Sequence, residues 1–102
     1  MTDLEMTRLC AEAMKLRNEY RSKLGGLFVF VTDEYGEQWS HYDPLHDDAQ
    51  AMALVKKFEL QLSSGAFHPM KWTVWREFKS AESVNLNRAI VECVAKMQAA
   101  KK

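Results

Sequence analysis

The chain has 102 residues, no formal net charge, and 47% hydrophobic and 27% charged residues. These values are typical of one globular domain with its own core, and they argue against a disordered chain. Nucleic-acid-binding proteins usually carry a basic surface, so the balanced charge argues against that class.

The N-terminal residues are acidic and lack the apolar centre of a signal peptide. No apolar run approaches the roughly 18 residues of a membrane span. We therefore expect a single domain over residues 1–102, in a reducing cytoplasm and without membrane contact.

The first segment is predicted to be a helix. Thr2, followed three residues later by Glu5, matches a capping box, with Asp3 as the alternative cap. Apolar residues recur at helical spacing over 6–16. We expect the helix to extend to Leu24 and to end at Gly25-Gly26, because glycine readily adopts the left-handed cap.

Two strands should follow this helix. Leu27–Thr32 is β-branched and aromatic with apolar residues on both faces, which predicts a central strand. Asp33–Gly36 has turn chemistry. Glu37–Tyr42 is the predicted return strand, with Trp39 and His41 on one face.

Proline in Asp43-Pro44 ends the return strand, because it cannot donate to the ladder. Asp47 or Asp48 should cap a second helix, whose apolar stripe runs to Phe58. Glu59–Ser63 alternates with a period of two and is predicted to be a third strand.

Met70–Phe78 is the predicted fourth strand, with Trp75 on its more polar face. Ser80 or Ser83 should cap the last helix, whose apolar stripe runs over 86–97. The fold class is therefore α+β in the order α-ββ-α-ββ-α, with an antiparallel sheet of about four strands and helices packed mainly on one face.

The two cysteines, Cys10 and Cys93, each occupy an apolar position of a predicted helix. Cysteine in such a position behaves as a small hydrophobic residue, so we expect two buried thiols. A disulfide between the helices is the alternative, and no cysteine spacing suggests zinc.

One short turn concentrates carboxylates and imidazoles that could bind a divalent metal or act as an acid/base pair: His41, Asp43, His46, Asp47 and Asp48. The same residues also fit structural roles, because aspartate shapes turns and caps helices. The sequence contains no nucleophile or phosphate-loop motif, so an enzyme is the minority interpretation and no cofactor is predicted.

Aromatic residues at polar-side strand positions are typical of protein interfaces. They predict an interaction surface made of Tyr35, Trp39 and Trp75. One alternative is that Trp75 packs under a loop or a helix end. Another is base stacking, in which Trp75 would be accompanied by Lys71, Arg76 and Lys79.

The turn Tyr42–Ala49, with Ala53-Leu54 and Asn87–Val91, resembles a family of small phage- and prophage-encoded proteins of unknown function. That family often has an aromatic-Asn-Pro-Leu-x-Asp-Asp turn, and here Tyr42 and Asp43 stand where Trp and Asn are common. The resemblance implies an accessory protein in the cytoplasm of a bacterial host. We therefore expect a protein partner, with a homodimer as one form of it and nucleic acid as the weaker alternative.

Overall fold

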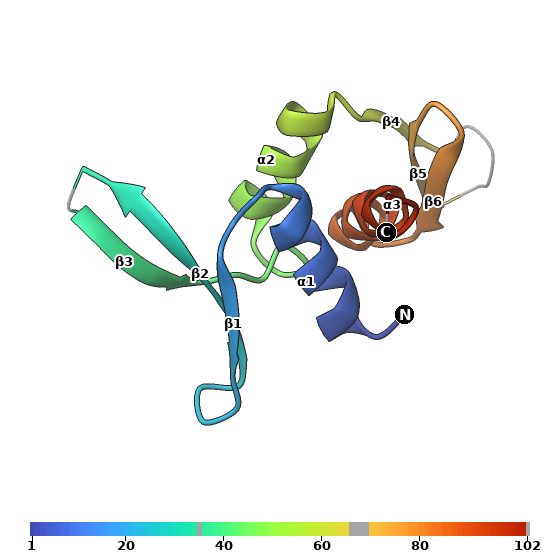
Figure 1. Cartoon of the computed structure of the whole chain (residues 1–102). Helices are drawn as coiled ribbons and strands as arrows, with labels where there is room; N and C mark the ends of the chain where they lie inside the picture. The colour runs from blue at the N-terminus through green and yellow to red at the C-terminus, as the bar shows by residue number, and fades with distance from the viewer. Residues whose placement is uncertain (35, 66–69, 102) are drawn as a thin grey trace.

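The computed structural model describes residues 1–34, 36–65 and 70–101. Over these residues the fold is α+β, with helices and strands in the following order (Figure 1): α1 (Asp3–Ala13), β1 (Asn18–Arg21), β2 (Gly26–Asp33), β3 (Gly36–His41), α2 (Asp48–Phe58), β4 (Gln61–Ser64), β5 (Trp72–Arg76), β6 (Lys79–Ser83) and α3 (Leu86–Ala99).

The strands form two antiparallel sheets of three, in the orders β1-β2-β3 and β4-β5-β6. The prediction of one sheet of about four strands is therefore corrected, whereas the alternation of helices and antiparallel strands broadly agrees. Figure 1 shows the two sheets on opposite sides of the helices. The molecule is elongated, with principal extents of 42 × 27 × 27 Å.

Helix α3 is the central element, because it packs against α1, α2, β5 and β6. Its stripe is fully buried at Ile90, Val91 and Val94. The first sheet contributes Leu27 and Val29 to this core, and the second contributes Val74 and Ala81, each sheet from one of its faces.

The first helix ends eleven residues earlier than Leu24, at Ala13. Lys15 adopts a left-handed conformation, with φ of 59°. Its N–H donates to the carbonyl of Glu12, and the N–H of Leu16 donates to the carbonyl of Ala11. These two bonds are the Schellman arrangement that ends many helices, here built without the usual glycine.

The glycines predicted to stop that helix serve the first sheet instead. Gly25 has φ of 72° in the turn between β1 and β2. Gly26 starts β2 beneath the ring of His41, where an added Cβ would lie 2.5 Å from the imidazole Nε2 atom. A larger residue at this position would displace the histidine.

The segment predicted to lead into the last helix forms a further strand, β6. Arg76 of β5 pairs with Lys79 of β6 across a two-residue turn, in which Glu77 has φ of 55°. Helix α3 is capped by Asn85, whose side-chain oxygen accepts from the N–H of Arg88, and not by either predicted serine. Of the candidate caps, Thr2 caps α1 rather than Asp3, and Asp47 caps α2 rather than Asp48.

None of the described helices combines the length and apolar character that crossing a membrane requires.

Replacing Lys15 by glycine should stabilise the protein. The left-handed region destabilises a residue with a Cβ atom by about 1–2 kcal/mol, and glycine avoids this cost. Glycine also gives the unfolded chain more conformational freedom, which offsets part of the stabilisation. We expect Lys15→Gly to raise the free energy of unfolding in urea by about 0.5–1 kcal/mol. Lys23→Gly is the matched control, because Lys23 is exposed and its φ is not positive. An equal rise in both variants, or a fall in Lys15→Gly, would contradict the assignment of this helix end.

Candidate interaction site and the acidic turn

The acidic turn, residues 42–48, joins β3 to α2 and is anchored in the core. Tyr42 and Leu45 are buried, and Pro44 is among the most deeply buried side chains. The carbonyl of Asp43 accepts from the N–H groups of His46 and Asp47, at 3.0 and 2.8 Å. The turn therefore connects the first sheet to α2 in a defined conformation.

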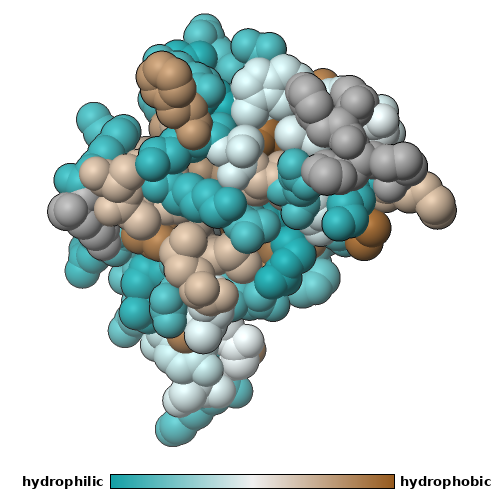
Figure 2. Space-filling model, turned by 90° about the vertical axis from the view of Figure 1, so that its right-hand side faces the viewer, coloured by the Kyte–Doolittle hydropathy of each residue, from teal (hydrophilic) through white to brown (hydrophobic). Residues whose placement is uncertain are grey.

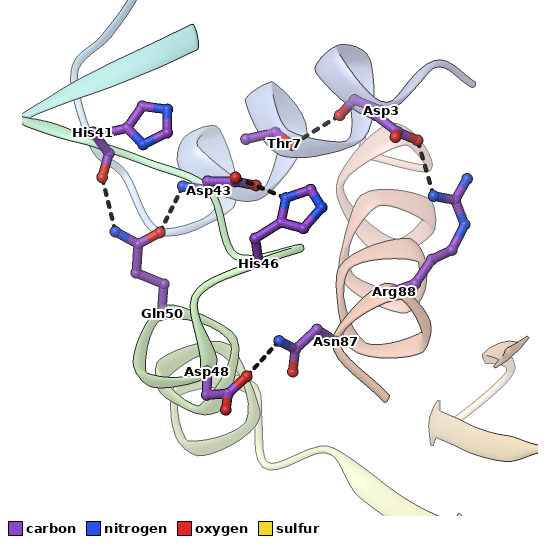
Figure 3. Close-up of polar contacts among 9 residues, drawn as sticks. All are labelled: Asp3, Thr7, His41, Asp43, His46, Asp48, Gln50, Asn87 and Arg88. Carbon is purple, nitrogen blue, oxygen red and sulfur yellow. Dashed lines mark hydrogen bonds and ion pairs between the residues drawn. The ribbon is translucent and has the colours of Figure 1, made fainter. Parts of the chain in front are cut away.

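The side chain of Gln50, in α2, forms hydrogen bonds with the backbone of this connection (Figure 3). Its Oε1 atom accepts from the N–H of Asp43 at 2.6 Å, and its Nε2 atom donates to the carbonyl of His41 at 2.9 Å. The N–H of Gln50 in turn donates to the carboxylate of Asp47, the helix cap. One side chain of α2 thus bonds two backbone groups at the end of β3 and the start of the turn.

The other carboxylates near the turn hold the helices together (Figure 3). Asp48 accepts from the side-chain amide of Asn87 at 2.8 Å, which links α2 to α3. Asp3 accepts from the guanidinium of Arg88 at 3.0 Å, which links α1 to α3.

The five predicted metal ligands do not converge on one point. His46 pairs with Asp43, Asp47 caps α2, Asp48 binds α3, and His41 stacks beside Phe28. Among the residues that the structure describes, no three side chains of histidine, cysteine, aspartate or glutamate form a group that could hold a metal ion. The arrangement favours the structural interpretation of this turn.

The closest approach to acid/base chemistry is the pair of Asp43 and His46. The Nδ1 atom of His46 lies 2.8 Å from a carboxylate oxygen of Asp43, which is how a carboxylate orients an imidazole. The histidine side chain is 79% exposed, so it faces water rather than an enclosed site. The two residues lie three positions apart in the sequence, so their pairing is a local contact that closes the turn.

The two cysteines are free and buried, as predicted. The Cys10 thiol donates to the carbonyl of Val91 at 3.4 Å, and the Cys93 thiol donates to the carbonyl of Lys79. Burial, reinforced by the neighbouring Cys93, raises the pKa of Cys10 to about 12. Burial also raises the pKa of Cys93 to about 11, against an opposing effect of Lys96.

Tyr42 lies on the core side of the turn. Burial, and then the nearby Cys10, raise the pKa of its phenol above the ordinary value. Its hydroxyl oxygen is buried and has no hydrogen-bond partner among the described residues. Tyr42 therefore contributes to packing rather than to proton transfer.

The outward side of the first sheet gathers aromatic rings and arginines. Side chains alternate along a strand, so the burial of Leu27 and Val29 places Phe28 and Phe30 on the other face of β2. Strand β3 pairs Trp39 with Phe30, and His41 with Phe28. We call this surface, completed by two arginines, the aromatic face: Arg17, Arg21, Phe28, Phe30, Trp39 and His41.

The rings of the aromatic face contact one another directly. Phe30 and Trp39 meet edge to face with centroids 5.4 Å apart, and Phe28 and His41 lie tilted at 5.2 Å. Edge-to-face contacts of this kind are the favoured geometry for aromatic pairs. The rings of Phe28, Phe30 and Trp39 are half-buried, and that of His41 is exposed.

The two arginines lie over the same rings. The guanidinium of Arg17 is 5.7 Å from the ring centre of Trp39, and that of Arg21 is 5.0 Å from it. Arg21 also pairs with Glu19 of its own strand at 3.2 Å. These contacts are within the range of cation–π attraction, so they hold long side chains in defined positions on an accessible surface.

The predicted interaction surface is divided by the fold. Trp39 belongs to the first sheet and Trp75 to the second, on opposite sides of the helices, so the two do not share a surface (Figure 1). Trp75 is half-buried. Thr73, which the sequence predicts on the same outward face, is buried, so both faces of this strand are at least partly covered. Tyr35 lies outside the described residues.

The arginines and phenylalanines of the aromatic face were missed as site residues. Phe28 and Phe30 carry a visible signal, because they alternate with Leu27, Val29 and Val31. The arginines carry none, because their segment was predicted to be helical. Arg21 is placed beside β2 by β1, and Arg17, just before β1, by a bond from the N–H of Phe30 to its carbonyl.

No protein-family model, curated protein or solved structure matches this chain. The resemblance of the turn to phage- and prophage-encoded proteins therefore stays a prediction.

Removing the Gln50 side chain should loosen the connection between β3 and α2. Gln50→Ala removes the partner of the Asp43 N–H and of the His41 carbonyl, groups that are part-buried and exposed, and we expect the free energy of unfolding to fall by about 0.5–1.5 kcal/mol. Gln61→Ala, on the exposed side of β4, is the control and should change stability by less than about 0.5 kcal/mol. Equal effects of the two substitutions would refute the role given to Gln50.

The buried thiols should be inert in the folded protein. With pKa values of about 12 and about 11, Cys10 and Cys93 hold almost no thiolate at pH 8, so a disulfide reagent should modify the native chain far more slowly than the chain in guanidinium. The folded state favours the protonated thiols, so this contribution to stability is complete below the ordinary pKa of 9.0 and is lost as the pH rises towards 12. Fast native labelling at pH 8 would contradict the burial of both thiols.

Proposed function

We propose that this chain is a small accessory protein, of the phage or prophage type that its turn resembles, that binds another protein through the aromatic face. The observation that carries the proposal is the stacking of Arg17 and Arg21 over Trp39 on a sheet surface turned away from the core. Tryptophan and arginine are the residue types most often found at the energetic centre of protein interfaces.

The side chains of the aromatic face are held in place by one another, and this supports binding. Association costs conformational entropy when flexible side chains become fixed. Here Arg17 and Arg21 already contact rings, and the rings of Phe30 and Trp39 contact each other, so part of that cost is met before a partner arrives.

The charges favour a protein over a nucleic acid at this surface. Arg21 is paired with Glu19, and Glu37 lies across from Thr32 at the far end of the same strand pair. A phosphate backbone favours a run of unopposed cations, whereas one of the two arginines of the aromatic face is already paired with an acid. The partner we expect presents a mixed apolar and polar surface, and a second copy of the chain is one protein that could do so.

Substitution at the aromatic face should abolish partner capture. The chain is immobilised, proteins retained from a bacterial host lysate are identified by mass spectrometry, and the affinity of the purified partner is then measured for Trp39→Ser and Arg17→Glu. We expect each to weaken binding at least about tenfold, because residues of these types dominate interface energies. Arg8→Glu, an exposed charge reversal on α1, is the matched control and should bind as the unchanged chain does.

Amide hydrogen exchange of the complex then locates the contact. Protection of β1 and β3 supports the proposal. A partner that Trp39→Ser and Arg17→Glu retain at full affinity, or protection confined to the second sheet, would refute it.

A further inference from the structure

The turn between β5 and β6 carries an aromatic ring that the rest of the chain does not contact. Phe78 is 99% exposed, the highest exposure among the large hydrophobic residues of the described chain. It follows Glu77, whose left-handed backbone, with φ of 55°, is a conformation that favours glycine. A two-residue hairpin turn requires a positive φ, so the backbone of Glu77 follows from the turn itself. The stability of the fold does not explain the fully exposed apolar ring beside it.

A groove runs beside this ring, between the hairpin and the C-terminal end of α3. It has a volume of about 280 Å³ and is lined by Arg76, Glu77, Phe78, Lys79, Met97 and Lys101. The half-buried thioether of Met97 forms an apolar part of the wall. Methionine adapts its shape easily, which suits a groove that accepts a side chain from outside.

The charge of the groove is predominantly positive in a chain with no net charge. Three of its lining residues are cations and only Glu77 is an acid. Lys96 precedes Met97 in the sequence but does not line the groove, and its ammonium donates to the carbonyl of Ser80 at 3.0 Å. One cation, Arg76, is partly offset by Glu59 at 3.5 Å, and the net excess remains positive.

We infer that the groove between Phe78 and Met97 binds a short acidic polypeptide segment that carries one large apolar side chain. The apolar side chain enters the groove against Phe78 and Met97, and the flanking carboxylates of the partner pair with Lys79 and Lys101. This site is separate from the aromatic face, which lies on the other side of the helices (Figure 1).

The surface around the hairpin favours a short segment over broader partners. Seen from the side of the second sheet, the molecule is mainly hydrophilic, and its hydrophobic residues form separate patches (Figure 2). A flat bilayer would leave the groove unfilled, and a single aromatic anchor gives only marginal membrane binding. A single-stranded nucleic acid usually stacks on several successive aromatic rings, and this turn offers one.

The test is fluorescence anisotropy with a labelled nine-residue peptide of aspartates and glutamates around one central phenylalanine. We expect the chain to bind it, with affinity that falls as salt rises. Phe78→Ser and Lys79→Glu should each weaken binding about tenfold, and so should glycine in place of the peptide's phenylalanine. Phe78 makes almost no contact with its own chain, so Phe78→Ser should keep the circular dichroism spectrum and melting temperature unchanged.

Two controls lie outside the groove. Val84→Ser removes another exposed apolar side chain, and Lys23→Glu reverses another exposed charge; both should bind the peptide with unchanged affinity. Trp39→Ser should also bind the peptide normally. The experiments therefore distinguish an error in the proposed aromatic-face interaction from an error in the proposed groove.

Three results would overturn the inference. The first is no binding of the peptide at millimolar concentration, and the second is equal binding by Phe78→Ser. The third is tighter, Phe78-dependent binding of phosphatidylserine vesicles or of a twelve-base thymidine oligonucleotide, which would assign the hairpin to a membrane or to nucleic acid.

Discussion

The alternation of side chains along β2 determines which surface the first sheet presents to solvent. Leu27 and Val29 belong to the buried core, so the intervening Phe28 and Phe30 must lie on the opposite face. A shift of register by one residue would exchange the two sets, expose the aliphatic residues and bury the rings. The pairing of β2 with β3 adds Trp39 to the outward face, and the aromatic face therefore depends on this single choice of register.

Helix α3 is the second constraint on the fold. It and the helices around it lie between the two sheets, and both sheets bury residues in this one core. Helix α3 contacts α1 and α2 on the side of the first sheet, and β5 and β6 on the other. The acidic turn belongs to this framework: Asp48 and Asp3 bind Asn87 and Arg88 of α3, and Gln50 closes the turn itself. Of the carboxylates that suggested a metal site, Asp48 thus links two helices, Asp47 caps α2 and Asp43 pairs with His46.

The sequence predicted well what local chemistry decides. The central strand, the faces of β3, the caps Thr2 and Asp47 and the buried thiols all follow from periodicity, capping residues or apolar position. It failed where a residue with a Cβ atom adopts the left-handed conformation in place of glycine. Lys15 ends α1 and Glu77 turns β5 into β6 in this way, so β1 and β6 were missed and two sheets were taken for one. The arginines of the aromatic face and the exposed Phe78 depend on those two strands, and no local pattern identifies them.

The most direct test of the β2 register is the set of through-space proton contacts of the Trp39 indole, measured by NMR. We expect contacts with the Phe30 ring and with the side chains of Arg17 and Arg21, together with an indole N–H that exchanges readily with water. Contacts of the indole with the methyl groups of Val29 or Ile90 would contradict this register, because they would place the tryptophan in the core and remove the surface proposed for binding.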